Sequence, residues 1–160
     1  MNKSSIILAA LALAVGTSGG PVFAGHGSYH GDGHLLLTPD ELEWSDIASM
    51  APGAKIAVIE GDLSEAEPFT FRLKLPAGYR IDPHFHPAYE RVTVISGKLH
   101  FAHGEEFDRA QTTALPAGGV AIMPPGEPMF GYAEEETVMQ LHGQGPWGIE
   151  YVNPEHDPRQ

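Results

Sequence analysis

The amino-acid sequence predicts a single all-β domain of the jelly-roll barrel type, preceded by a short N-terminal helix. Its length of 160 residues suits one domain. Its 19 glycines and 14 prolines are spread along the chain, where they act as turn signals. Seven or eight short segments with strand patterns follow one another at regular spacing, and the chain has no internal repeat. These three observations favour a barrel of short antiparallel strands.

The first 24 residues have the pattern of a secretory signal peptide. Lys3 gives a basic start, the apolar run Ile6–Val15 follows, and Val22–Ala24 supplies the small residues that a signal peptidase reads. The apolar run is too short to span a bilayer, which disfavours an uncleaved membrane anchor. We therefore expect cleavage after Ala24 and a periplasmic or secreted protein that is not attached to a membrane.

The composition excludes several classes of function. The net charge is -12, and without residues 1–24 it becomes -13 because Lys3 is lost. Such a chain repels phosphate groups, so we expect no nucleic-acid partner. The chain has no cysteine, which excludes disulfides, thiolate ligands and a cysteine nucleophile. Any metal ligands must therefore be histidine, carboxylate, methionine or backbone oxygen.

The mature chain divides into a leader, a domain and a tail. Residues 25–37 form a leader rich in Gly and His, for which flexible chain is favoured over a metal-binding tract. The domain spans residues 38–153, and the polar tail, residues 154–160, is expected to be loose. Thr38, Pro39 and Glu41 have the pattern of a capping box at a helix start. We expect that helix to end before Ala51.

Period-two alternation predicts the strands of the domain. Between Phe69 and Leu75, for example, every second residue is apolar, which indicates a half-buried strand. The acidic turn Glu134–Glu136 is expected to join two paired strands. The predicted strands are Lys55–Gly61, Phe69–Leu75, Glu90–Ser96, Leu99–Ala102, Val120–Met123, Phe130–Ala133, Thr137–Leu141 and Trp147–Tyr151.

Two histidines and a glutamate form the strongest candidate site. His84 and His86 are two residues apart on an extended segment, so their rings leave the same face. Glu90 opens the next strand at an even offset from His86. If that face is the barrel interior, two imidazoles and one carboxylate converge there. This ligand set can hold a divalent ion such as Fe, Mn, Zn or Cu and leave open positions opposite the protein.

The spacing of these residues resembles the first motif of the cupin family. That motif is Gly, five residues, His-x-His, three residues, Glu, six residues and Gly, and here it begins at Gly78 and ends at Gly97. The second cupin motif is present in part, as Gly118, Pro124 and Gly126. Most of the mature chain resembles small exported cupins with a leading helix. The resemblance implies a barrel and a homodimer, and it transfers no established activity.

The position at which the family has its fourth metal ligand, a histidine, is Met129 here. A thioether is a weak ligand for hard ions, so with iron, manganese or zinc Met129 would stay off the metal and leave three ligands. With copper(I), Met129 would bind beside the two histidines and Glu90 would become peripheral. A third alternative is a decayed site that binds no metal well.

Four further residues are candidates for the pocket. Gln140 and His142 share a face of the strand expected to pair with the one after Met129, and His142 would replace the missing ligand if that face is interior. A hydrogen-bonded structural histidine is the alternative. Tyr79 and Tyr132 are candidates for the mouth of the barrel, and aromatic core packing explains them equally well.

Two classes of function remain open. As an enzyme, the protein would use a metal as Lewis acid or redox centre on a small oxygen-bearing molecule, as an oxygenase, isomerase or lyase. As a binding module, it would hold a metal such as copper, or a small ligand, without turnover. Met129 and the histidines of the leader favour the second class, and the fold alone does not discriminate.

Overall fold

The computed structural model describes residues 28–160. The predicted signal peptide, its cleavage site after Ala24 and His26 of the leader lie outside the described residues. Among residues 28–160, no helix is long and apolar enough to cross a membrane.

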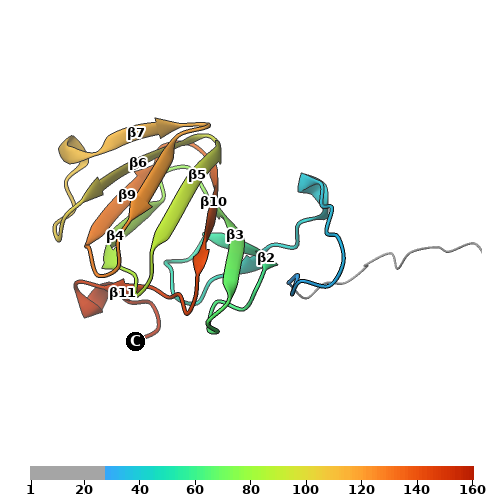
Figure 1. The fold of residues 1–160 in the computed structure, drawn as a ribbon. Coiled ribbons are helices and arrows are strands. Elements are labelled where there is room, and N and C mark those ends of the chain that lie inside the picture. Colours follow the sequence, from blue (N-terminus) through green and yellow to red (C-terminus); the bar gives the residue numbers. More distant parts are fainter. Residues whose placement is uncertain (1–27) are drawn as a thin grey trace, which may run out of the picture.

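Two antiparallel sheets pack face to face and enclose the core (Figure 1). The all-β jelly-roll prediction is therefore confirmed. The six-stranded larger sheet has the order β1 (Ser45–Asp46), β2 (Lys55–Glu60), β3 (Pro68–Leu75), β10 (Thr137–Gln144), β5 (Glu90–Ser96) and β8 (Val120–Met123). The five-stranded smaller sheet has the order β11 (Glu150–Tyr151), β4 (Arg80–Phe85), β9 (Met129–Ala133), β6 (Lys98–His103) and β7 (Thr113–Pro116).

The alternation seen in the sequence separates the inner and outer faces of the larger sheet. In β3, the side chains from Phe69 to Leu75 are alternately buried and half-buried. Cross-strand partners share a face, so the register places Leu73 beside Met139 of β10. Met139 in turn lies beside Val94 of β5. The inner face therefore continues across three strands, which explains why the period-two pattern predicted them correctly.

The pairing expected across the acidic turn is wrong. β9 pairs with β4 and β6 in the smaller sheet, whereas β10 pairs with β3 and β5 in the larger sheet. The connection Glu134–Glu136 therefore carries the chain from one sheet to the other instead of closing a hairpin. Both strands have a buried apolar face, and burial between two sheets satisfies this pattern as well as pairing within one sheet does.

The N-terminal helix is shorter than expected. It is a three-residue 3-10 helix, η1 (Pro39–Glu41). The capping interaction is present, because the Thr38 backbone N–H donates to the Glu41 carboxylate at 2.7 Å. None of its residues is buried, and a helix without a packed face is not propagated in water. The chain instead continues into β1, which pairs with β2.

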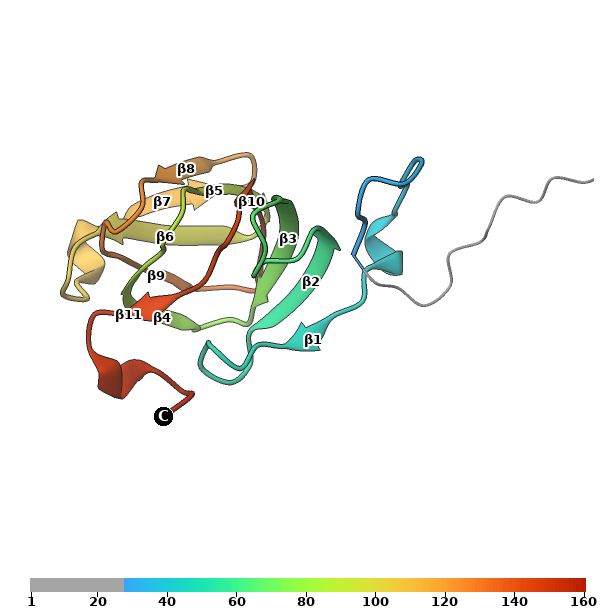
Figure 2. The same ribbon diagram turned by 60° about the horizontal axis from the view of Figure 1, so that its bottom comes forward.

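The tail is not loose, contrary to expectation. It contains the 3-10 helix η3 (Pro154–His156), in which the Asn153 side chain accepts a hydrogen bond from the Glu155 backbone N–H at 3.1 Å. Arg159 then donates to the backbone carbonyl of Ile149 at 3.1 Å. Figure 2 shows this segment folded beneath β4 and β11. Polar residues here form a hydrogen-bonded structure, which apolar periodicity does not reveal.

Three smaller features complete the fold. The sequence did not predict β1, β7 or the 3-10 helix η2 (Arg109–Gln111). The last predicted strand, residues 147–151, is regular only over β11. Residues 28–44 lie beside β2, where Tyr29 forms a parallel bridge with Glu60, and they extend away from the two sheets in both views (Figures 1 and 2).

Candidate metal site

The three predicted ligands lie at one end of the space between the sheets. His84 is near the end of β4, His86 directly follows β4, and Glu90 is the first residue of β5. All three side chains are buried: His84 is 4%, His86 1% and Glu90 5% exposed. The loop after β4 therefore brings an acid from the larger sheet toward two imidazoles at the edge of the smaller one.

The turns around this loop depend on two motif glycines. Gly97, between β5 and β6, has φ 75°, and a Cβ on it would lie 2.4 Å from the carbonyl oxygen of Glu136. Gly126 has φ 74°, and its N–H donates to the backbone carbonyl of His86 at 2.9 Å. The glycines of both motifs therefore serve backbone conformations that disfavour a side chain. Gly126 also fixes the backbone of a candidate ligand.

Both histidines are held in the same tautomer. Nδ1 of His84 lies 2.7 Å from the carbonyl oxygen of Asp82, and Nδ1 of His86 lies 2.5 Å from that of Gly148. A carbonyl only accepts hydrogen bonds, so each Nδ1 donates. In a neutral imidazole the other nitrogen, Nε2, then carries a free lone pair, which is the form that binds a metal.

His86 and Glu90 leave buried acceptors without donors. His86 Nε2 lies 3.5 Å from Glu90 Oε1. His86 Nε2 and Glu90 Oε2 are both buried and have no hydrogen-bond partner among residues 28–160. Leaving buried polar atoms unsatisfied is costly. A cation between the two side chains would satisfy both.

Burial changes the protonation of all three groups. Burial lowers the pKa of His84 to about 4. Burial, together with the neighbouring His84, lowers the pKa of His86 to about 3. Burial raises the pKa of Glu90 to about 8. At neutral pH the metal-free site therefore contains two neutral imidazoles and a protonated carboxyl, and a bound cation would replace that proton.

The pairwise distances fit a metal, but the three side chains do not form a closed set. Two atoms that each lie about 2.0–2.2 Å from one ion can be up to about 4 Å apart, which includes the 3.5 Å between His86 and Glu90. The rings of His84 and His86 have centroids 5.0 Å apart. Within residues 28–160, however, no group of three or more His, Asp or Glu side chains is close enough to count as a metal site. The donor types fit a metal, and binding would require small side-chain movements.

Met129 lies on the inner face beside His84. The two residues are cross-strand partners in β9 and β4, so their side chains share a face. Met129 is fully buried, at 0% exposed. His103 of β6 is the partner of Met129 on its other side, in the same row. The sequence did not single out His103, because its relation to Met129 depends on strand register.

The four other pocket candidates lie away from this centre. Gln140 and His142 are partners of Thr93 and Arg91 on the outer face of β5, so His142 does not replace the missing ligand. The Tyr79 hydroxyl donates to the carbonyl of Ala51 at 2.6 Å, a structural role.

Tyr132 also belongs to packing and not to the mouth of the barrel. It is the cross-strand partner of His100 on the outer face of the smaller sheet. Its ring stacks on that of His100, with centroids 4.3 Å apart. The guanidinium of Arg109 lies 4.2 Å from its centroid on η2.

A segment that sequence reasoning did not connect with the site closes it. The Trp147 ring stacks on His86, with centroids 4.5 Å apart and planes at 20°. The next residue, Gly148, supplies the carbonyl that orients His86. Trp147 was identified only as an alternating strand residue, and no local pattern links it to a histidine 61 positions earlier.

The one cavity of note in the described chain is elsewhere. It has a volume of about 730 Å³ and lies between residues 29–42 and the outer face of β2, β3 and β10. Gln140 and Arg72 line it, and Arg72 Nε donates to Gln140 Oε1 at 3.2 Å. Cavity size alone would therefore point away from the buried histidines.

Comparisons with known proteins agree with this architecture. A family model described as "Domain of unknown function (DUF4437)" matches residues 36–156. No curated protein matches the sequence.

Solved structures with similar folds are cupins. A putative acetylacetone dioxygenase from Methylibium petroleiphilum PM1 has a TM-score of 0.60 at 16% identity, with 79% of this chain and 85% of that chain covered. An RmlC-like cupin from Shewanella frigidimarina NCIMB 400 has a TM-score of 0.55 at 15% identity, with coverage of 69% and 89%. Salicylate 1,2-dioxygenase from Pseudoaminobacter salicylatoxidans in complex with gentisate has a TM-score of 0.53 at 17% identity, with coverage of 65% and 30%. At these identities the likeness shows the fold alone.

Proposed function

The chain belongs to the DUF4437 family and has the cupin fold, and from this premise we propose that it is a metal-dependent protein that acts on a small molecule. His84, His86 and Glu90 would hold the metal. The family description assigns no activity, so the proposal rests on the chemistry of the site.

One observation carries the proposal. Two imidazoles donate through Nδ1 to backbone carbonyls, while His86 Nε2 and Glu90 Oε2 are buried without partners in the described chain. A purely structural core would pair these atoms or replace them with apolar groups. A site prepared for a cation has this arrangement, in which the outer nitrogens are fixed and the inner lone pairs are free.

The residues divide the work between binding and shielding. A metal in this site would polarise an oxygen of the bound molecule or exchange electrons with it. His84 and His86 supply neutral ligands, and Glu90 supplies the negative charge once its proton has left. Trp147 covers His86 and limits the access of water, so a small molecule would enter only if this segment moved. Fe, Mn, Zn and Cu all suit such a set of donors.

Metal titration tests the proposal. Purified protein is titrated with Mn²⁺, Zn²⁺ and Cu⁺ by calorimetry, together with the variants His86→Ala and His142→Ala. We expect one site per chain, its loss in His86→Ala, and wild-type affinity in His142→Ala, because His142 is exposed on the outer face. Absence of binding for all three ions, or equal loss in both variants, would refute the proposal.

A second candidate function is non-catalytic binding of a soft metal, specifically copper(I). Met129 favours it, because its side chain is fully buried on the inner face beside His84. A thioether and an imidazole suit copper(I) better than they suit a hard ion. Substitution Met129→His separates the two functions. It should raise the affinity for Mn²⁺ if His84, His86 and Glu90 form the site, and lower the preference for Cu⁺ if Met129 is a ligand.

Export and pairing complete the proposal. The N-terminal pattern supports a periplasmic or secreted protein, which the mass of the mature chain from the native compartment tests: cleavage after Ala24 is expected. The exposed apolar residues Val120 and Ile122, on the edge strand β8, support a homodimer. Light scattering of the purified protein measures that mass directly, and a monomer would refute the pairing.

A further inference from the structure

Two backbone carbonyls orient the histidines of the candidate site. The carbonyl of Asp82, within β4, accepts from His84. The carbonyl of Gly148, just before β11, accepts from His86. Such partners fix the ring orientation and the tautomer of a metal-binding histidine. The position of these two carbonyls therefore decides whether both lone pairs point toward one ion.

The carbonyl of Gly148 receives little support from packing. Trp147 and Gly148 lie between β10 and β11 in a stretch without regular secondary structure. Apart from its chain neighbours, no described atom lies within 4 Å of the position that a Cβ on Gly148 would take. Polar contacts must therefore position this carbonyl.

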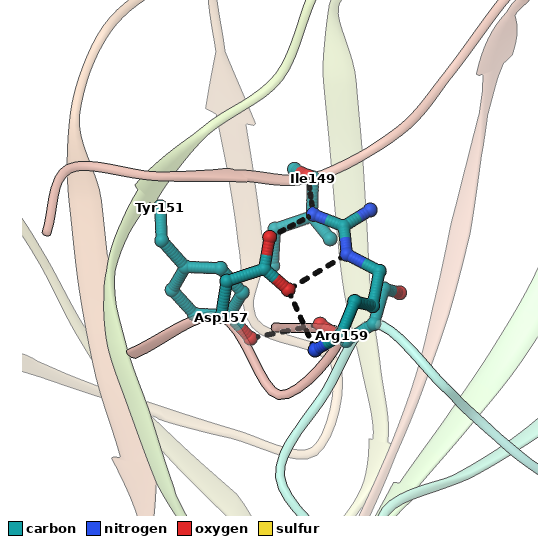
Figure 3. A network of polar contacts seen from close by, with 5 residues as sticks. Ile149, Tyr151, Asp157 and Arg159 are labelled. Atoms are coloured by element: carbon teal, nitrogen blue, oxygen red, sulfur yellow. Dashed lines mark hydrogen bonds and ion pairs between the residues drawn. The ribbon is translucent and has the colours of Figure 1, made fainter. Parts of the chain in front are cut away.

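Those contacts come from the segment that follows β11. Arg159 Nη2 donates to the carbonyl of Ile149, the residue directly after Gly148, at 3.1 Å (Figure 3). The Asp157 carboxylate holds the guanidinium, accepting from Arg159 Nε and Nη2 at 2.7 Å each. The Asp157 side chain is only 14% exposed. The pair thus forms a bidentate ion pair with one further hydrogen bond to the backbone, a geometry with high directional specificity.

The same segment also reaches the strand that carries His84. The backbone N–H of Val152 donates to the carbonyl of Pro83 at 3.0 Å. Nδ1 of His156 lies 3.7 Å from the carboxylate of Asp82. Pro83 and Asp82 directly precede His84, so both orienting carbonyls are next to backbone that residues 152–159 hold.

We propose that Asp157 and Arg159 are positioning residues that fix the Gly148 carbonyl and through it the tautomer of His86. This inference rests on the proposed function, because its purpose is an aligned metal site. The ion pair does not contact the metal ligands. It acts through the backbone of Ile149 and Gly148.

The test compares two exposed ion pairs. Arg159→Met removes the contact with Ile149, and Lys55→Met serves as the matched control. The Lys55 side chain is 42% exposed and pairs with Asp46 at 2.6 Å, against 44% for Arg159. In the metal-free proteins, nitrogen-15 NMR of the imidazoles reports the tautomer of His86. Calorimetry with Zn²⁺ alone reports affinity.

We expect a single Nδ1–H tautomer of His86 in the wild type and in Lys55→Met, and a mixture of both tautomers in Arg159→Met. Zn²⁺ affinity should fall about 10–100-fold in Arg159→Met, the usual effect of losing an outer partner of a ligand, and change less than about twofold in the control. If Arg159→Met does not fold, Asp157→Asn replaces it, with the same direction expected.

A wild-type tautomer and wild-type affinity in these variants would overturn the inference. A wild type that binds no Zn²⁺ or other metal would instead overturn the proposed function, while the tautomer measurement would still decide the role of Arg159. A merely stabilising ion pair would lower the melting temperature of both variants and leave the tautomer of His86 unchanged.

Discussion

Glu90 is the residue on which the electrostatics of the site depend. Its carboxyl is buried, and this burial raises its pKa from 4.5 to about 8. The nearest imidazole cannot offset the effect by ionising, because burial lowers the pKa of His86 to about 3. The metal-free protein therefore retains a proton on Glu90 across a range of pH in which the unfolded chain has lost it.

This difference predicts how stability changes with pH. Because the pKa of Glu90 is raised on folding, its protonated form stabilises the folded state fully below about pH 4.5, and this contribution is lost as the pH rises to about 8. The loss should approach about 1.4 kcal/mol per pH unit. Glu90→Gln has no such proton. Urea unfolding of metal-free wild type and Glu90→Gln between pH 5 and 8 should give a stability difference that moves steadily against the wild type.

Glu105→Gln is the control, since Glu105 is exposed. Its stability should follow that of the wild type at every pH. Parallel curves for the wild type and Glu90→Gln would show that Glu90 is already ionised in the folded protein, and that water or a rearranged side chain solvates it.

Spacing along the chain was enough to predict which residues face the interior at this site. His84, His86 and Glu90 are separated by even numbers of residues on extended chain, so their common orientation is a local property. The role of Gly148 is not local: its carbonyl meets His86 across 62 residues. A backbone carbonyl carries no side-chain signal, so only the folded structure could identify it.

At the scale of the element, alternation predicts a strand and not its partner. β9 and β10 were expected to form a hairpin because they are consecutive and joined by a short acidic turn. The structure places them in different sheets. Each strand presents an apolar face to the same core, so both arrangements give the same sequence pattern. Register with distant strands, here β4 with β9 and β3 with β10, decides between them.

The turn between β5 and β6 allows a test at this scale. Gly97 and Gly78 both have positive φ, 75° and 79°. A Cβ on Gly97 would lie 2.4 Å from the Glu136 carbonyl oxygen, whereas a Cβ on Gly78 has open space. Gly78→Ala should therefore cost about 1–2 kcal/mol, from conformation alone. Gly97→Ala should cost clearly more, because β5 and β6 must also move apart from the start of β10.

Chemical denaturation of the two variants beside the wild type measures the difference. Equal losses would mean that the Glu136 backbone yields without cost. Since Gly78 and Gly97 occupy equivalent ends of the same motif, each variant serves as the control for the other.

At the scale of the whole molecule, the candidate site joins parts that fold together only at the end. Glu90 comes from the larger sheet and His84 from the smaller one. Residues 147–159 close the site and pair with β4. An unfolded chain has no such convergence, so a metal that binds these residues stabilises the complete fold and not one element of it.

Zn²⁺ should therefore raise the melting temperature in proportion to its binding. At a free concentration of 100 times the dissociation constant, the stabilisation is about 2.7 kcal/mol. For a domain of this size that corresponds to roughly 5–10 °C. Scanning calorimetry with and without a chelator measures the shift, and His86→Ala should lose it while His142→Ala keeps it. A shift of equal size in His86→Ala would place the bound metal elsewhere on the acidic surface, and a metal-induced fall in melting temperature would mean that the unfolded chain, with its nine histidines, binds the ion more tightly.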